Sequence, residues 1–182
     1  MEEIFTKGKE TKNITLFFAL AKGDKNDLVI QKATEIGVKN IVLIETKRCV
    51  AKMNDDSKQA HKFDRYMKIM KEASEQSHRL DIPNIYGVYK INKIPGNLLP
   101  VNKFVAYEKE QGNTDSFYKD LMQIDLDSSI GIMVGPEGGF EKEEVEYLNS
   151  IGFKNASLGN RILRTETAAI YAMSVISFLL ER

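Results

Sequence analysis

Residues 14–20, Ile-Thr-Leu-Phe-Phe-Ala-Leu, restrict the fold more than any other part of the chain. β-branched and aromatic side chains dominate this run, and apolar residues fall on both faces of the strand that it would form. A strand of this kind must be covered on both sides. This is typical of the middle of a parallel sheet that has helices on each face.

The segment after this strand predicts a βαβ unit. A turn over residues 22–24 leads into a helix, with Asp24 at a capping position and Gly37 at the end of the helix. Residues 41–44 then form a second short strand. Strands joined through a helix normally run parallel, so the expected fold class is α/β with a mainly parallel sheet.

The rest of the chain keeps alternating between strands and helices. The longest helix is expected to place one apolar stripe against the core and a basic side toward solvent. No linker is long enough to divide the chain, so we expect one α/β domain over residues 14–182, with helices on both faces of its sheet. The further expected strands are 85–91, 104–107, 130–134 and 155–158; the helices are 57–79, with Phe63, Met67, Met70 and Ala73 on its stripe, 114–123, 141–151 and 165–182.

Charge and cysteine content limit the classes of function. The 26 basic and 26 acidic side chains cancel, which excludes a protein that binds nucleic acid by bulk positive charge alone. Residues 1–90 hold 17 Lys and Arg against 13 Asp and Glu, a net charge of +4, so a basic face is expected from the first half. Cys49 is the only cysteine, which gives no disulfide and no familiar zinc spacing; we expect no metal site and a cytoplasmic location.

The sharpest local motif is Gly-Pro-Glu-Gly-Gly-Phe at residues 135–140, here called the glycine loop. It directly follows the strand expected at 130–134. Ligands of open parallel sheets bind at the carboxyl ends of strands, and glycine lets a ligand approach the backbone closely. The alternative is a tight turn that binds nothing. The loop matches neither the P-loop nor the dinucleotide-binding pattern, so a phosphate site is poorly supported.

A second motif, Ser-Leu-Gly-Asn-Arg-Ile-Leu-Arg-Thr-Glu-Thr-Ala-Ala at residues 157–169, is here called the junction segment. It runs from a short strand into a helix, where polar side chains face solvent or a site, whereas Ile162 and Leu163 favour burial. Arg164 and Glu166 are candidates for chemistry. The alternative for Thr165 and Glu166 is purely structural, with one capping the helix and the other interacting with its dipole.

Together with residues 30–38 and 72–79, these two motifs closely resemble the RsmE-type methyltransferases of the SPOUT class. The resemblance covers nearly the whole chain from about Ile14 onward. It implies an S-adenosylmethionine-dependent enzyme that methylates N3 of a uridine in small-subunit (16S) ribosomal RNA. It also implies a SPOUT-like α/β domain with a C-terminal trefoil knot.

The resemblance further implies where the cofactor and a partner subunit bind. It points to a homodimer through the C-terminal helix, and residues 168–180 are apolar around most of the helix circumference, which independently favours such an interface. The residues implied for the cofactor are Gly135, Glu137 and Gly138 on the methionine and ribose side, and Leu158, Gly159, Ile162 and Leu163 around the adenine.

Methylation of uridine N3 requires loss of a proton, so negative charge develops on the ring oxygens. The planar fork of Arg164 is suited to stabilise that charge, and Glu166 is the candidate base. For RNA contact the candidates are Arg79, Arg65 and Lys62, on or at the end of the long basic helix. The alternative for each of these is an ordinary solvated side chain.

The beginning of the chain departs from the family pattern. Family members start with a PUA-like RNA-binding domain, whereas only residues 1–13 precede the first strand here, and we interpret them as a remnant of or linker to such a domain. Two other functions stay open. One is a cofactor- or RNA-binding remnant without turnover, and the other is a small-molecule α/β enzyme that uses the glycine loop for a nucleotide.

Overall fold

The computed structural model describes residues 13–51, 56–107, 114–125 and 127–180. Strands and helices alternate along these ranges, as the sequence predicted, and short 3₁₀ turns η1 (Ile91–Lys93) and η2 (Gly96–Leu98) follow the third strand. The main elements are β1 (Ile14–Ala19), α1 (Lys25–Ile36), β2 (Asn40–Glu45), α2 (Asp56–Gln76), β3 (Asn84–Lys90), β4 (Asn102–Ala106), α3 (Thr114–Met122), β5 (Ile130–Val134), α4 (Lys142–Ser150), β6 (Phe153–Ala156) and α5 (Thr165–Leu180).

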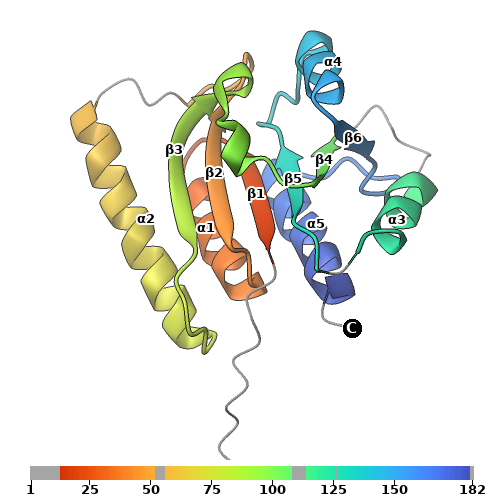
Figure 1. The fold of residues 1–182 in the computed structure, drawn as a ribbon. Helices are drawn as coiled ribbons and strands as arrows, with labels where there is room; N and C mark the ends of the chain where they lie inside the picture. The colour runs from red at the N-terminus through yellow and green to blue at the C-terminus, as the bar shows by residue number, and fades with distance from the viewer. Residues whose placement is uncertain (1–12, 52–55, 108–113, 126, 181–182) are drawn as a thin grey trace, which may run out of the picture.

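The strands form one sheet in the order β3-β2-β1-β5-β4-β6, and all neighbouring pairs are parallel (Figure 1). β1 is an inner strand of the sheet; it pairs with β2 on one side and with β5 on the other. The prediction of an α/β fold with a parallel sheet is therefore confirmed. The trefoil knot implied by the family resemblance stays a prediction.

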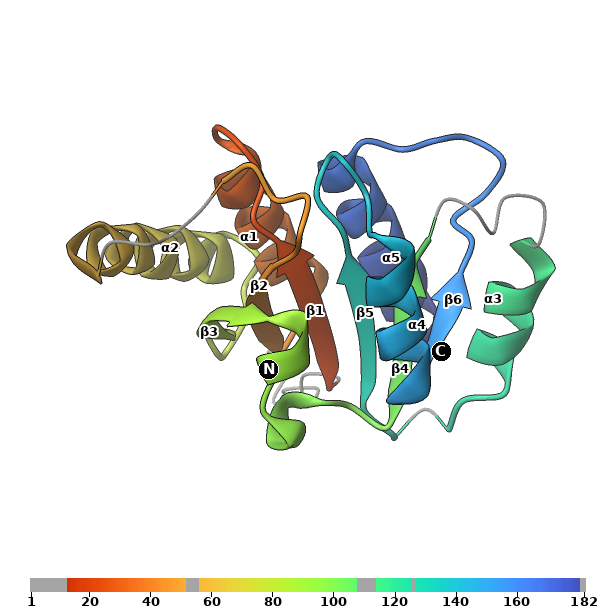
Figure 2. The ribbon, with the colours of Figure 1, turned by 90° about the horizontal axis from the view of Figure 1, so that it is seen from above.

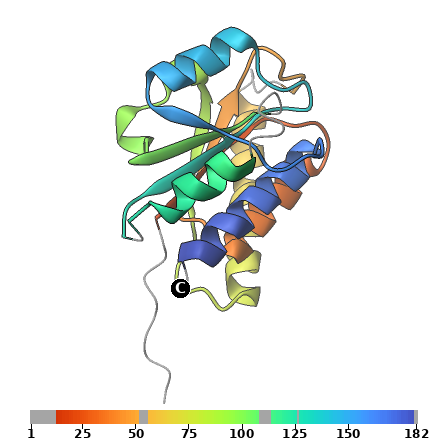
Figure 3. The same cartoon turned by 90° about the vertical axis from the view of Figure 1, so that its right-hand side faces the viewer.

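Helices cover both faces of the sheet, but not equally. α1 and α5 lie side by side on one face, with α2 packed on the outer side of α1 (Figure 2). α4 covers the opposite face, above β6 (Figure 3). Within the described ranges, no helix is both long and apolar enough to cross a membrane.

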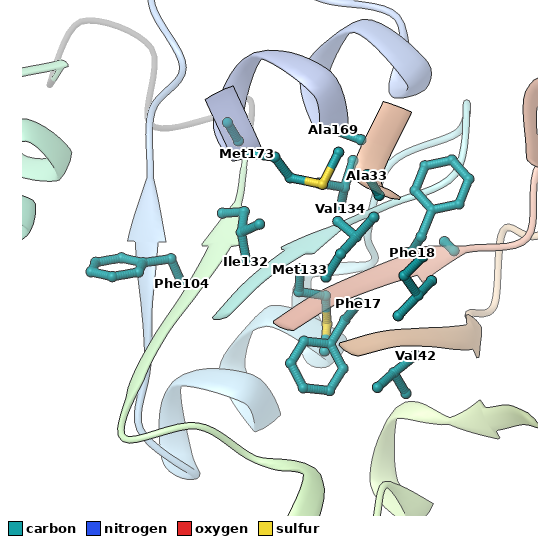
Figure 4. Close-up of a cluster of buried hydrophobic side chains, with 14 of the residues drawn as sticks. Phe17, Phe18, Ala33, Val42, Phe104, Ile132, Met133, Val134, Ala169 and Met173 are labelled. Carbon is teal, nitrogen blue, oxygen red and sulfur yellow. The ribbon is translucent and has the colours of Figure 1, made fainter. Parts of the chain in front are cut away.

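The core is built on the two sides of β1. Figure 4 shows Phe17 and Phe18 pointing to opposite sides of the strand, and neither side chain is exposed. On one side Phe17 meets the ring of Phe153 edge-on at a centroid distance of 5.9 Å. Phe18 points the other way, toward the face of the sheet where Ala33 of α1 lies. Each fully buried aromatic ring contributes about 1.5–3 kcal/mol of hydrophobic stabilisation.

Two local predictions were wrong. Met67 of α2 is 46% exposed, and Tyr66 is buried in its place, because α2 packs on one neighbouring helix and its buried stripe is rotated. The last strand begins at Phe153 rather than residue 155, since Gly152 turns the chain at a φ of +89° and strand pairing starts directly afterwards. Asp24 occupies the N-cap position of α1, as predicted, although its side chain makes no capping hydrogen bond.

Gly131 of β5 offers a test of core packing. A Cβ atom at this position would lie 2.6 Å from Pro100 Cγ and 3.2 Å from Phe17 Cε2. We therefore expect Gly131→Ala to lower the free energy of unfolding by about 1–3 kcal/mol, as overpacking of a dense core does. Urea denaturation measures the change.

The matched control is Gly96→Ala, because no atom lies within 4 Å of the Cβ that it would add. We expect this variant to unfold within about 0.5 kcal/mol of the parent. Equal urea midpoints for the two variants would show that Pro100 yields to the new methyl group.

Candidate functional site

The glycine loop and the junction segment meet at the carboxyl edge of the sheet. The glycine loop follows β5 and the junction segment follows β6, and the parallel strand order brings these two strand ends to the same edge. Together with Lys25 at the start of α1 and Tyr107 after β4, the two segments line a cavity of about 420 Å³. Ligands of parallel α/β sheets bind at this edge, so the cavity is the candidate site.

Six of the seven residues that the resemblance implied for a cofactor lie in the wall of this cavity. They are Gly135, Glu137, Leu158, Gly159, Ile162 and Leu163. Gly138 is not part of the wall, because its carbonyl oxygen turns toward the loop after β2 and accepts a 2.7 Å hydrogen bond from Arg48 Nη1. Ile162 was expected to be buried, but it is 76% exposed and lies at the mouth of the cavity.

A hydrogen bond joins the two segments directly. The hydroxyl group of Thr165 donates to the carbonyl oxygen of Gly135, across 30 residues of sequence. α5 begins at Thr165, so this residue is the first of the helix rather than its cap. A Cβ atom at Gly135 would lie 2.9 Å from the ring of Phe140, which explains why a glycine stands there.

The loop between β2 and α2 supports the glycine loop from outside. Arg48 Nε pairs with Glu141 Oε1 at 2.9 Å, and the backbone N–H of Lys47 donates to Glu144 Oε1 at 2.8 Å. Glu141 and Glu144 also form the capping box that starts α4. These contacts fix the end of the glycine loop to the sheet on one side and to α4 on the other.

Three charged side chains from three segments form a cluster beside the cavity, here called the charge cluster: Lys25, Glu137 and Glu166. Lys25 Nζ lies 2.9 Å from Glu137 Oε1 and 3.6 Å from Glu166 Oε2. The backbone N–H of Lys22 also donates to Glu137 Oε1, at 3.4 Å. Glu166 does not line the cavity; its side chain is 15% exposed and lies beside Lys25.

The pairing keeps two members of the charge cluster ionised. The hydrogen bond to Glu137 raises the pKa of Lys25 above its ordinary value, against a smaller opposing effect of burial. Burial by itself would raise the pKa of Glu137, but the hydrogen bonds from Lys25 and from backbone N–H groups outweigh it and hold that pKa below its ordinary value. Both groups are therefore charged throughout the neutral pH range.

Two arginines stand at the cavity on the junction segment. Arg161 and Arg164 are exposed and both line the cavity, while the carbonyl oxygen of Arg164 accepts the backbone N–H of Ala168 at the start of α5. Their positive charge at an open rim suits an anionic partner.

The residues predicted for RNA contact do not gather at the cavity. Arg79 is 9% exposed, and its Nη1 donates to the carbonyl oxygens of Thr34 and Val38 at 2.7 and 3.0 Å. The carbonyl of Thr34 is in the last turn of α1 and that of Val38 just before β2, at the edge of the sheet opposite the cavity. A role of Arg79, Arg65 and Lys62 in RNA contact stays a prediction. Arg79 is engaged by the fold, Arg65 pairs with Asp27, and Lys62 is exposed on α2.

Comparison with known proteins agrees with this arrangement. A family model described as an RNA methyltransferase domain matches residues 8–177. The chain belongs to this RNA methyltransferase family.

Two curated relatives of the RNA methyltransferase domain carry the same name. The chain is 40% identical over 165 residues to ribosomal RNA small subunit methyltransferase E of Bacillus subtilis, covering 89% of this chain and 64% of that protein. It is 34% identical over 180 residues to the protein of the same name from Rickettsia conorii, covering 98% and 70%. The chain thus spans about two thirds of the length of these relatives.

A solved structure shares the fold. Ribosomal RNA small subunit methyltransferase E from Neisseria gonorrhoeae, crystallised bound to S-adenosyl methionine, aligns with a TM-score of 0.74 and 30% identity. The alignment covers 92% of this chain and 66% of that one.

The sequence did not reveal the part that two basic residues, Lys25 and Arg48, play in the site of this RNA methyltransferase domain. Lys25 and Glu137 are 112 residues apart in sequence, and Arg48 and Glu141 are 93 apart. Neither basic residue stands in a distinctive motif; Lys25 follows an ordinary Lys-Gly-Asp turn. The available signal is that each lies just after a strand of the predicted parallel sheet, where side chains from distant segments converge.

Proposed function

We propose that this RNA methyltransferase domain uses S-adenosylmethionine to methylate N3 of a uridine in small-subunit (16S) ribosomal RNA. The observation that carries the proposal is the cavity formed by the glycine loop and the junction segment at the carboxyl edge of the sheet. Its support comes from relatives named ribosomal RNA small subunit methyltransferase E and from a structural neighbour with S-adenosyl methionine bound.

The residues of the cavity fit this cofactor. Gly159 adopts a φ of +115°, and no atom lies within 4 Å of the place that a Cβ would take, so a ligand has access to its backbone. Leu158 and Leu163 are half-buried and offer apolar contact to an adenine ring. Ser157 Oγ is buried without a hydrogen-bond partner in the described part of the chain and lines the same cavity.

When bound, the cofactor supplies a methyl group on a positively charged sulfur atom. The protein must then position the uridine and stabilise the negative charge left when N3 loses its proton. Arg164, exposed at the cavity, is our candidate for that stabilisation, because its guanidinium can donate to a ring carbonyl oxygen. The role of Glu166 as a base stays a prediction.

The proposed substrate is ribosomal RNA or an assembled small subunit. Arg161, Arg164 and exposed Ile162 at the mouth of the cavity present charge and apolar surface to a phosphate backbone and a base. A cytoplasmic location of the protein is part of the same proposal, because this substrate is found there.

Calorimetric titration and methyl transfer together test the function. We expect S-adenosylmethionine to bind in the low micromolar range or tighter, and labelled methyl groups to pass to 16S ribosomal RNA or small subunits. Binding without transfer to either substrate would favour a remnant without turnover. Binding of nucleotides in place of S-adenosylmethionine would favour a small-molecule enzyme.

Arg164 is tested by two substitutions. We expect Arg164→Ala to leave cofactor affinity within a few-fold of the parent and to lower the transfer rate about 10²-fold, the scale of losing one charge-stabilising donor. Arg164→Lys keeps the charge and loses the planar fork, so we expect a similar loss. Full transfer by Arg164→Lys would show that the fork is not used.

We also propose a homodimer through α5. Buried residues cover one side of this helix, whereas Tyr171 and Phe178 are exposed on the other side, Phe178 at 71%. These residues are seven positions apart and lie on the same face of the helix. An interface formed by this face on two copies is self-complementary, as two-fold contacts require.

Light scattering tests the dimer. We expect the parent to have twice the chain mass of 20.7 kDa, and Phe178→Asp or Tyr171→Asp to give folded monomers. Ile176→Asp is the contrasting variant, because Ile176 is fully buried and a charge there should unfold the subunit itself. A parent mass near 20.7 kDa would exclude the dimer.

A further inference from the structure

The charge cluster contains one ammonium group for two carboxylates. Lys25 Nζ is within hydrogen-bond distance of Glu137 Oε1 at 2.9 Å, and 3.6 Å from Glu166 Oε2. Glu166 Oε2 is buried and, within the described part of the chain, has no hydrogen-bond partner. A buried carboxylate oxygen without a hydrogen-bond donor is costly, and the ion pair with Lys25 at 3.6 Å is longer than a hydrogen bond. A closer approach of Lys25 to Glu166 would therefore lower the free energy of this oxygen.

The two carboxylates differ in their access to a ligand. Glu137 and Lys25 both line the cavity, whereas Glu166 does not. In this structure the Glu137 oxygen that faces Lys25 also accepts the backbone N–H of Lys22. The hydrogen bonds from Lys25 and Lys22 occupy this oxygen, so a ligand that hydrogen-bonds to the same oxygen must compete with Lys25.

We propose that Lys25 exchanges partners when ligand binds, moving from Glu137 to Glu166, so that Glu166 is a positioning residue that frees Glu137 for the cofactor. This inference rests on the proposed function, because the competing ligand is the proposed cofactor. The movement is small, since the same Nζ already lies within ion-pair distance of both carboxylates. Lys25 stays charged at both positions, because each partner is a carboxylate.

The alternative is a static clamp, in which Lys25 only ties the glycine loop to α1 and α5. The two readings predict opposite effects of removing Lys25. If the charge cluster is a clamp, removing the charge of any of its members should weaken cofactor binding. In an exchange, Lys25 competes with the ligand whenever Glu166 cannot accept it, so its removal restores binding.

Calorimetric titration of S-adenosylmethionine and S-adenosylhomocysteine into four proteins separates these readings. Glu166→Gln keeps Lys25 on Glu137, and we expect both ligands to bind about tenfold more weakly, the scale of one net hydrogen bond. Lys25→Met should bind at least as tightly as the parent. The double variant should recover most of the affinity lost by Glu166→Gln.

The rescue is the outcome that a structural clamp does not give. If the double variant binds more weakly than Glu166→Gln, or if Lys25→Met alone loses affinity while its thermal unfolding matches that of the parent, the exchange is excluded. Thermal unfolding of each variant shows whether the fold is kept. Absence of binding to the parent protein would instead overturn the proposed function, so the two failures are distinguishable.

Discussion

Phe17 and Phe18 are buried on opposite faces of β1, so both faces of this strand must be covered, and the rest of the structure depends on how this is done. Its backbone groups need a strand on each edge, and β2 and β5 supply them in parallel. Parallel pairing in turn requires crossover helices, which become the layers that bury the two rings. It also brings the ends of β5, β4 and β6 to one edge, so the same constraint that builds the core assembles the cavity.

Much of this fold could be predicted from local patterns, because a strand buried on both faces and a helix that ends at glycine are readable from neighbouring residues. The errors arose where a distant partner decides the outcome. Tyr66 rather than Met67 is buried because α1 lies where it does, and no periodicity within α2 contains that information. Ile162 is apolar yet exposed, since its loop forms the rim of a cavity instead of packing into the core.

The candidate site was predictable to the extent that it is made of backbone. Glycines after a strand mark places of close approach, and six of the seven residues that the family resemblance implied for the cofactor meet in one cavity wall. The charged side chains were not predictable in this way. Lys25 pairs with Glu137, which is 112 residues away in sequence. Arg79 was a candidate for RNA contact because of its charge, but it donates hydrogen bonds to the carbonyl oxygens of Thr34 and Val38 near the end of α1. Tertiary contacts decide which charges reach a ligand.

The hydrogen bond from Thr165 to Gly135 joins a residue near the end of the chain to one made much earlier during synthesis. The cavity wall runs from Lys25 to Ala168, so its last part leaves the ribosome only when almost the whole domain has been synthesised. A chain that stops short of α5 would contain every strand of the sheet and most of both loops, but neither Thr165 nor the helix that completes the cavity wall. The hydrogen bond that ties the glycine loop to the junction segment therefore forms only after the start of α5 has been made.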